Sequence, residues 1–188
     1  MGKSNSKIVL GIDPGSRTTG FGLLEVTPNG PSYIESGVIQ VHKVPDFANR
    51  LRILHETVEV LCERFKPDVS VIEKVFFAKD ARAALKLGQA RGAIIAAIAK
   101  SDVELIEVSP NEVKSSIAGY GHAKKEQVQE MVKAILKVEN FATVDASDAL
   151  AIALFYGTRL ETPSSMTFDS GRGGQRNDRL SQGRVEGS

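Results

Sequence analysis

Four acidic side chains from three separate segments of the chain have the chemistry of a divalent-metal site. They are Asp13, Glu73, Asp145 and Asp148. Carboxylate oxygens are the ligands that Mg²⁺ prefers, and clustered carboxylates repel one another strongly unless a cation is bound. Two cations ~3.5–4 Å apart can activate a water and stabilise the leaving oxygen when a phosphodiester is cleaved. Because the sequence has no Cys/His spacing typical of zinc sites, we interpret the four acids as the metal site of a nuclease.

Each acid taken alone also has an ordinary structural explanation. Asp13 precedes Pro-Gly, where Asp is a common turn residue. Glu73 is compatible with a solvated position at a strand end, and Asp145 or Asp148 with a helix cap. The set of four is more specific than any member, because three segments supply acids to one predicted edge of a sheet.

The spacing of apolar residues predicts the strands and helices that would bring the acids together. The continuous apolar run at 8–12 is typical of a strand buried on both faces. Strands at 20–26 and 33–41 are joined by a short turn, which predicts an antiparallel hairpin. Apolar residues alternate by four and three from Phe47 to Phe65, which predicts a helix. Further strands are expected at 69–72 and 103–108, and further helices at about 78–100, between Ser109 and Gly119, around 128–136 and at about 143–158.

This order of elements predicts an α/β fold with a mixed five-stranded sheet and helices packed on its faces. Asp13 and Glu73 end the first and fourth strands, and ligands collect at the carboxyl ends of strands in open sheets. The two strands must be neighbours for these acids to meet, and the strand order 3-2-1-4-5 achieves this. Asp145 and Asp148 share one face of the last helix, near the N-terminal end where the helix dipole favours carboxylates.

Length and composition predict one globular domain followed by a tail. The chain has 188 residues, of which 41% are hydrophobic, and ~150 residues is the usual scale of one domain. We expect a nuclease domain at 1–161 and a disordered tail at 162–188, where Ser, Gly, Arg and Asp predominate. The single cysteine excludes an intrachain disulfide, and no apolar run approaches the ~18–20 residues of a membrane span. We therefore expect a soluble, cytoplasmic protein with no membrane partner.

Two basic stretches favour nucleic-acid binding, although the formal net charge is only +1. Their residues are Lys74, Lys79, Arg82, Lys86 and Arg91 in the first and Lys114, Lys124 and Lys125 in the second. Such patches neutralise DNA phosphates, whereas lysines on helices are often simply solvated. Phe76 lies beside the first stretch and is interpreted as an aromatic that stacks on an unpaired base, with packing against the core as the alternative.

Four segments resemble the RuvC family of Holliday-junction resolvases, which have the RNase H-like fold. The segments are GIDPGSRTTGFG at 11–22, VIEKVFFAKDARAALKLGQARG at 71–92, VKSSIAGYGHAKKEQVQ at 113–129 and DASDALAIA at 145–153. The resemblance extends from about residue 7 to 160, and the family's acidic positions fall on the four carboxylates above. It implies an endonuclease that resolves four-way DNA junctions in recombination and repair by symmetric, Mg²⁺-dependent paired nicks that leave ligatable ends.

The resemblance also implies roles for other residues and for partners. Lys114 and Lys125 match lysines near the family's active site and would stabilise charge on the phosphate in the transition state. The position of Phe76 is associated with bases at the crossover. Gly88 and Gly92 would lie at a homodimer interface, whose two-fold axis suits a junction with two equivalent strands; the alternative is a tight contact with the chain's own sheet. A branch-migration helicase complex is the implied motor partner.

As a mechanism we expect Asp13 to bridge two Mg²⁺ ions in each subunit, with Mn²⁺ as a possible substitute. Glu73 would hold one ion and Asp145 with Asp148 the other, and the division of labour between the last two is open. Three other classes compete with this hypothesis. An actin-like ATPase needs a second lobe, a small nuclease for ribosomal RNA lacks the LKLGQARG helix, and a non-catalytic junction binder predicts a lost acid.

Overall fold

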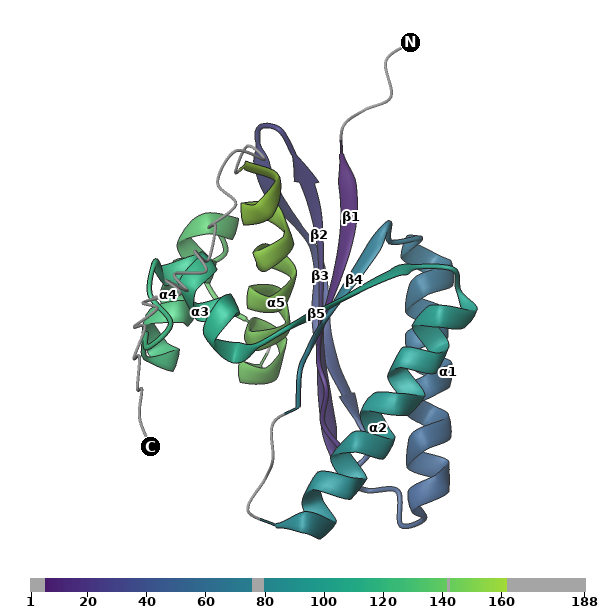
Figure 1. The fold of residues 1–188 in the computed structure, drawn as a ribbon. Helices are drawn as coiled ribbons and strands as arrows, with labels where there is room; N and C mark the ends of the chain where they lie inside the picture. Colours follow the sequence, from purple (N-terminus) through teal and green to yellow (C-terminus); the bar gives the residue numbers. More distant parts are fainter. Residues whose placement is uncertain (1–5, 76–79, 142, 162–188) are drawn as a thin grey trace, which may run out of the picture.

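The computed structural model describes residues 6–75, 80–141 and 143–161, and Figure 1 shows them as one sheet between two layers of helices. The strands are β1 (Lys7–Asp13), β2 (Thr18–Thr27), β3 (Gly30–Gln40), β4 (Val69–Glu73) and β5 (Glu104–Val108). Their order in the sheet is β3-β2-β1-β4-β5, which confirms the prediction. β1, β2 and β3 are antiparallel neighbours, whereas β4 lies parallel to both β1 and β5.

Helices cover both faces of the sheet, with α1 and α2 on one face and α3, α4 and α5 on the other (Figure 1). They are α1 (Phe47–Phe65), α2 (Ala81–Lys100), α3 (Pro110–Ala118), α4 (Lys125–Leu136) and α5 (Val144–Glu161). α2 begins at Ala81 rather than at the predicted residue 78, and the Asp80 carboxylate caps it by accepting a hydrogen bond from the Arg82 N–H at 2.9 Å. In α3, Ser109 and Glu112 form a capping box, as their spacing predicts.

Each face of the sheet has its own hydrophobic core. The core under α1 and α2 includes Leu10, Ile12, Leu54, Ile72 and Ile94. The core under α3, α4 and α5 includes Val9, Leu24, Val71, Val132 and Leu150. Successive residues of β1 therefore point into opposite cores, and this confirms the prediction that the first strand is buried on both faces. The strands that end in Asp13 and Glu73 are therefore held by packing on both faces of the sheet.

Glycines of β1 and β2 let α5 lie directly on the sheet. A Cβ atom at Gly11 would lie 2.2 Å from the carbonyl oxygen of Ala149, and one at Gly20 would lie 2.1 Å from that of Asp145. No side chain fits at such distances, so glycine is required where the two backbones approach. This close approach holds the first turns of α5 against the strands that lead to the predicted site.

Some predictions fall on residues outside the described ranges. The tail at 162–188, Phe76 and Lys79 are among them, so their predicted properties stay predictions. Among the helices of the described residues, none is long and apolar enough to cross a membrane.

Candidate active site

The two acids at strand ends lie side by side because β1 and β4 are parallel neighbours. Ile12 pairs with Ile72 in the ladder, so Asp13 and Glu73 follow at the same edge of the sheet. Both side chains are half-buried. The predicted topology thus brings together two acids that are far apart in the sequence.

α5 brings the other two acids to the same edge. Its first turn is capped by Thr143, whose Oγ1 accepts a hydrogen bond from the Ala146 N–H at 3.1 Å. One carboxylate oxygen from each of Asp13, Asp145 and Asp148 lies within 4.8 Å of the others, and all three residues are half-buried. Three of the four predicted ligands therefore form one group that could hold a metal ion.

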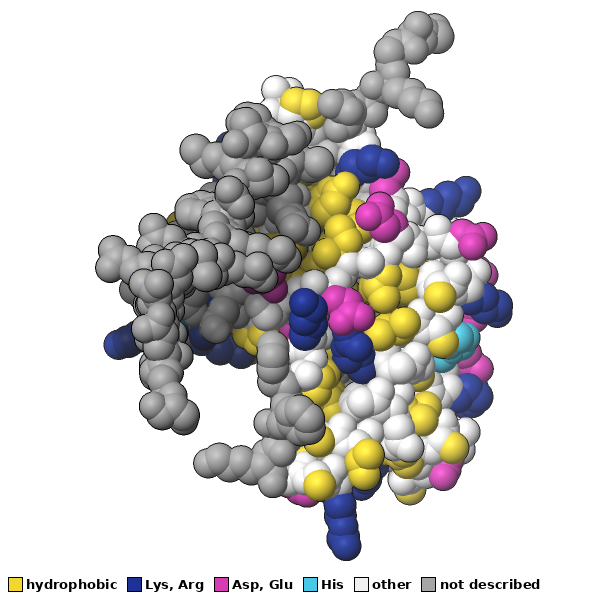
Figure 2. Space-filling view, viewed as in Figure 1, with side chains coloured by type: hydrophobic (Ala, Val, Ile, Leu, Met, Phe, Trp, Pro, Cys, Tyr) yellow, Lys and Arg dark blue, Asp and Glu magenta, His cyan; other side chains and the backbone are white. Residues whose placement is uncertain are grey.

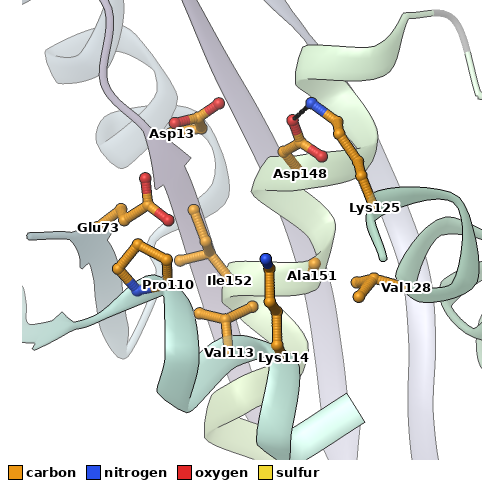
Figure 3. A pocket seen from close by; sticks show the side chains of 10 residues that line it. All are labelled: Asp13, Glu73, Pro110, Val113, Lys114, Lys125, Val128, Asp148, Ala151 and Ile152. Atoms are coloured by element: carbon orange, nitrogen blue, oxygen red, sulfur yellow. Dashed lines mark hydrogen bonds and ion pairs between the residues drawn. The ribbon is translucent and has the colours of Figure 1, made fainter. Parts of the chain in front are cut away.

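Three of the four acids line a pocket of about 320 Å³, shown from close by in Figure 3. Asp13, Glu73 and Asp148 line it from β1, β4 and α5, and Lys114 and Lys125 line it from α3 and α4. The remaining wall is apolar and consists of Pro110, Val113, Val128, Ala151 and Ile152. Both lysines that the sequence predicts for the site are thus brought to the acids.

Burial and mutual repulsion make the acidic group costly to ionise. Burial is the largest cause that raises the pKa of Asp13 to about 7, and the charges of Glu73, Asp148 and Asp145 raise it further. Burial, followed by the charge of Asp148, also raises the pKa of Glu73. A divalent cation relieves this repulsion, and an all-oxygen donor set suits a hard cation such as Mg²⁺. The residues present therefore fit the predicted metal.

Two lysines offset part of the negative charge. The Lys125 Nζ donates a hydrogen bond to Asp148 Oδ2 at 2.5 Å. Partial burial lowers the pKa of Lys125, but its hydrogen bond and attraction to Asp148 outweigh burial and raise the pKa overall. The charge of Lys125 lowers the pKa of Asp13, and Lys125 and Lys114 together lower that of Glu73. Lys125 is therefore a protonated, hydrogen-bonded part of the site.

The other predicted DNA contacts differ in their exposure. Four of them are exposed, namely Lys74, Arg82, Lys86 and Lys124, and the Lys86 Nζ lies 5.9 Å from the centre of the Phe47 ring. Arg91 faces inward instead, with a side chain that is 16% exposed, and its Nε donates a hydrogen bond to the Glu73 carbonyl oxygen at 3.1 Å. A signal for this was present in the sequence, because Arg91 lies at helical spacing between Leu87 and Ile94 on the apolar stripe of α2.

The fold and the site together define a metal-dependent nuclease of the RNase H-like class, in which acids from β1, β4 and α5 converge. The sequence profile described as "Crossover junction endodeoxyribonuclease RuvC" matches residues 9–156. The chain belongs to this RuvC family, and the matched segment contains all four acids.

Relatives and solved structures agree with this assignment. The crossover junction endodeoxyribonuclease RuvC of Geobacter sulfurreducens is 46% identical over 146 residues, which cover 78% of this chain and 89% of the relative. That of Hydrogenovibrio crunogenus is 48% identical over 148 residues, which cover 79% and 86%. The structure of Thermus thermophilus RuvC in complex with a Holliday junction substrate is similar with a TM-score of 0.77 and 31% identity, covering 82% of this chain and 94% of that chain.

Proposed function

We propose that this crossover junction endodeoxyribonuclease cuts four-way DNA junctions at the pocket between β1, β4 and α5, using two Mg²⁺ ions in each subunit. The observation that carries the proposal is the convergence of four acids from three elements, in which burial and the neighbouring charges raise the pKa of the half-buried Asp13 to about 7. The similar T. thermophilus protein was solved with a Holliday junction substrate, which supports the same class of substrate for this chain.

The arrangement of the acids supports a division between two ions. Asp13 is repelled by acids on both of its sides, Glu73 from β4 and Asp145 with Asp148 from α5. Asp13 would therefore contribute to both ions, Glu73 to one, and the pair on α5 to the other. When bound, the two cations supply an activated water and stabilise the leaving oxygen in phosphodiester hydrolysis.

The lysines of the pocket act on the phosphate rather than on the ions. Lys114 and Lys125 bring positive charge to the α3 and α4 side of the pocket, opposite Glu73 and Asp13 (Figure 3). Donors that are already in place where negative charge develops stabilise a transition state without reorganisation. The hydrogen bond to Asp148 keeps Lys125 in place before the DNA arrives.

Exposed basic residues would extend the DNA contact beyond the pocket. They are the exposed predicted contacts Lys74, Arg82, Lys86 and Lys124. Each phosphate contact adds affinity that falls as salt rises. Lys79 as a phosphate contact and Phe76 as a stacking residue belong to the same proposal, on their positions in the sequence alone.

The exposed face of α2 supports a homodimer. Leu85 is 68% exposed, and among the described residues a Cβ atom at Gly88 or Gly92 would meet nothing within 4 Å. The alternative, that these glycines make a tight contact with the chain's own sheet, is therefore wrong. Figure 2 shows apolar side chains gathered over α2 and β5 on the face turned to the viewer. Two copies paired through α2 would present two pockets to two equivalent strands, and a branch-migration helicase complex would be their motor partner.

The decisive experiment compares the wild type with Asp13→Asn on a synthetic four-way junction, with Mg²⁺ and with EDTA. We expect the wild type to make paired, ligatable nicks only with Mg²⁺. Asp13→Asn should bind the junction, because basic residues supply affinity, but cleave it on the order of 10³-fold more slowly, since several kcal/mol depend on the ions. Equal cleavage by the variant would overturn the site assignment. Equally fast cleavage of a linear duplex would overturn the junction specificity.

A further inference from the structure

Arg91 connects α2 to the backbone of a proposed metal ligand. Its Nε donates a hydrogen bond to the Glu73 carbonyl oxygen at 3.1 Å. Its Nη2 lies 2.9 Å from Glu107 Oε2 on β5. The guanidinium therefore spans the edge of the sheet where β4 ends and reaches both strands of the β4–β5 pair.

The position of Arg91 is poorly suited to a phosphate contact. Its side chain is 16% exposed, whereas that of its partner Glu107 is 46% exposed. The Nη2 atom is buried, and the Glu107 oxygen lies outside hydrogen-bonding geometry, so Nη2 has no hydrogen-bond partner among the described residues. The ion pair with Glu107 contributes little to net stability, because desolvation offsets its attraction, so a role in the site is a better explanation for this arginine than a gain in stability.

The hydrogen bond from Arg91 is made at the end of β4, where the main chain leaves the sheet. Glu73 is the last residue of β4, and the next amide, that of Lys74, donates to the Val108 carbonyl oxygen at 2.8 Å. β5 therefore holds the main chain from one side, and Arg91 holds it from α2. A carboxylate on this backbone can bind a cation only if the Cα–Cβ bond keeps its direction, because Mg²⁺ requires nearly ideal ligand geometry.

We propose that Arg91 is a positioning residue, which fixes the main chain at Glu73 so that the Glu73 carboxylate is aimed at the metal. This inference rests on the proposed role of Glu73 as a metal ligand. Groups that orient metal ligands typically contribute ~10–100-fold to metal affinity or activity. Arg91 thus touches neither the cation nor the phosphate, and its loss should change how the protein responds to metal.

The first test measures Mn²⁺ binding to the DNA-free protein by electron paramagnetic resonance of the free ion. We expect Arg91→Gln to weaken binding of one ion by on the order of 10-fold, and Glu73→Gln to weaken it more. Glu107→Gln is the matched control, because it keeps an oxygen near Nη2 and leaves the Nε bond to Glu73 intact, so its affinity should stay near that of the wild type. Wild-type Mn²⁺ affinity in Arg91→Gln would overturn the proposal.

The second test separates positioning from phosphate contact. In EDTA, Arg91→Gln should bind a four-way junction as the wild type does, whereas Arg82→Gln should bind more weakly and with a salt dependence reduced by about one phosphate contact. In cleavage, Arg91→Gln should need on the order of 10-fold more Mg²⁺ for half-maximal rate, and Arg82→Gln should not. Weakened junction binding at unchanged Mg²⁺ demand would reject positioning in favour of a phosphate contact.

Two features keep these outcomes interpretable. Partial unfolding raises the apparent half-saturating Mg²⁺ concentration by one over the folded fraction, so Arg91→Gln is measured at a temperature where circular dichroism shows it folded, and a shift of about 10-fold there cannot come from a loss of stability. Arg91→Lys keeps the charge but not the planar fork, and it should show a smaller shift in the same direction. If Glu73→Gln cleaves like the wild type, the proposed metal site fails; if Glu73→Gln is inactive and Arg91→Gln responds normally to Mg²⁺, only the positioning role fails.

Discussion

The two halves of the acidic site are held in place by different means. On the α5 side, backbone meets backbone, because Gly11 and Gly20 allow the helix to lie on the strands with no intervening side chain. On the β4 side, Glu73 is positioned by the ladder to β5 and by the single hydrogen bond from Arg91. The first half is fixed by packing, and the second by polar contacts that a substitution can weaken without displacing an element.

This difference predicts different responses to substitution. A change on the α5 side must move a helix that carries two acids and packs into a hydrophobic core. A change on the β4 side leaves the core intact and alters only the aim of one carboxylate. The first should act mainly on stability and the second mainly on the response to metal.

Gly11→Ala should have the largest effect. Its Cβ would overlap the Ala149 carbonyl oxygen, which belongs to a helix backbone and cannot rotate away. We expect the free energy of unfolding to fall by about 3 kcal/mol, as in overpacked cores, with cleavage lost as α5 shifts. Urea denaturation followed by circular dichroism measures the change.

Gly157→Ala in α5 is the matched control for Gly11→Ala. Its Cβ would lie 3.6 Å from Val26, an ordinary contact, and alanine favours a helix over glycine by ~1 kcal/mol. We expect this variant to be slightly more stable than the wild type and fully active. Equal destabilisation by both substitutions would show that α5 is not held by the close approach at Gly11.

The titration of Asp13 should make the metal-free protein less stable as the pH rises from about 4 to about 7. The pKa of Asp13 rises from 3.8 to about 7 on folding, so the folded state retains a proton that the unfolded state has lost, and this stabilisation disappears across that window. The raised pKa of Glu73 acts in the same direction. At ~1.4 kcal/mol per pKa unit, and with allowance for coupling between the acids, we expect Asp13 to account for roughly 2 kcal/mol.

Comparison with Asp13→Asn isolates this contribution, because other titrating groups are common to both proteins. The difference in unfolding free energy between the two should grow in favour of the variant from pH 4 to pH 8 in EDTA. Saturating Mg²⁺ should remove this advantage, since binding stabilises only the wild-type site. A difference that does not vary with pH would contradict the origin proposed for the raised pKa.

The sequence predicts the fold well because its strongest signals are periodic and local. Apolar runs and helical spacing predict the strands and helices. The short turn between β2 and β3 makes these strands neighbours, and Asp13 can meet Glu73 only if β4 lies beside β1, so few strand orders are left. The direction of Arg91 was missed, because an arginine on an apolar stripe does not reveal which partner it meets. The pair of Lys125 with Asp148 is also beyond sequence reasoning, because it depends on how α4 packs on α5.

Lys125→Gln should have the smallest effect on stability and a large effect on the reaction. Both partners of the ion pair are partly exposed, at 52% and 26%, so its loss should cost less than about 1 kcal/mol of unfolding free energy. The cleavage rate should fall on the order of 10²-fold, because a preorganised donor in the pocket is lost. The charge of Lys125 lowers the pKa of Asp13 and of Glu73, so both pKa values should rise when Lys125 is replaced. At limiting Mg²⁺ the cleavage rate increases as these acids lose their protons, so in Lys125→Gln this increase should occur at higher pH.

Lys133→Gln is the matched control for this last variant, since Lys133 also lies on α4 and forms an ion pair, with Glu130 at 2.8 Å, but does not line the pocket. Lys133→Gln should be about as stable as Lys125→Gln, and it should keep the wild-type cleavage rate and pH profile. A pH profile that stays unchanged in Lys125→Gln would mean that Lys125 does not tune the acids. A slow rate together with a shifted profile would show that Lys125 is part of the electrostatics of the site, through the contact with Asp148 that the packing of α4 on α5 creates.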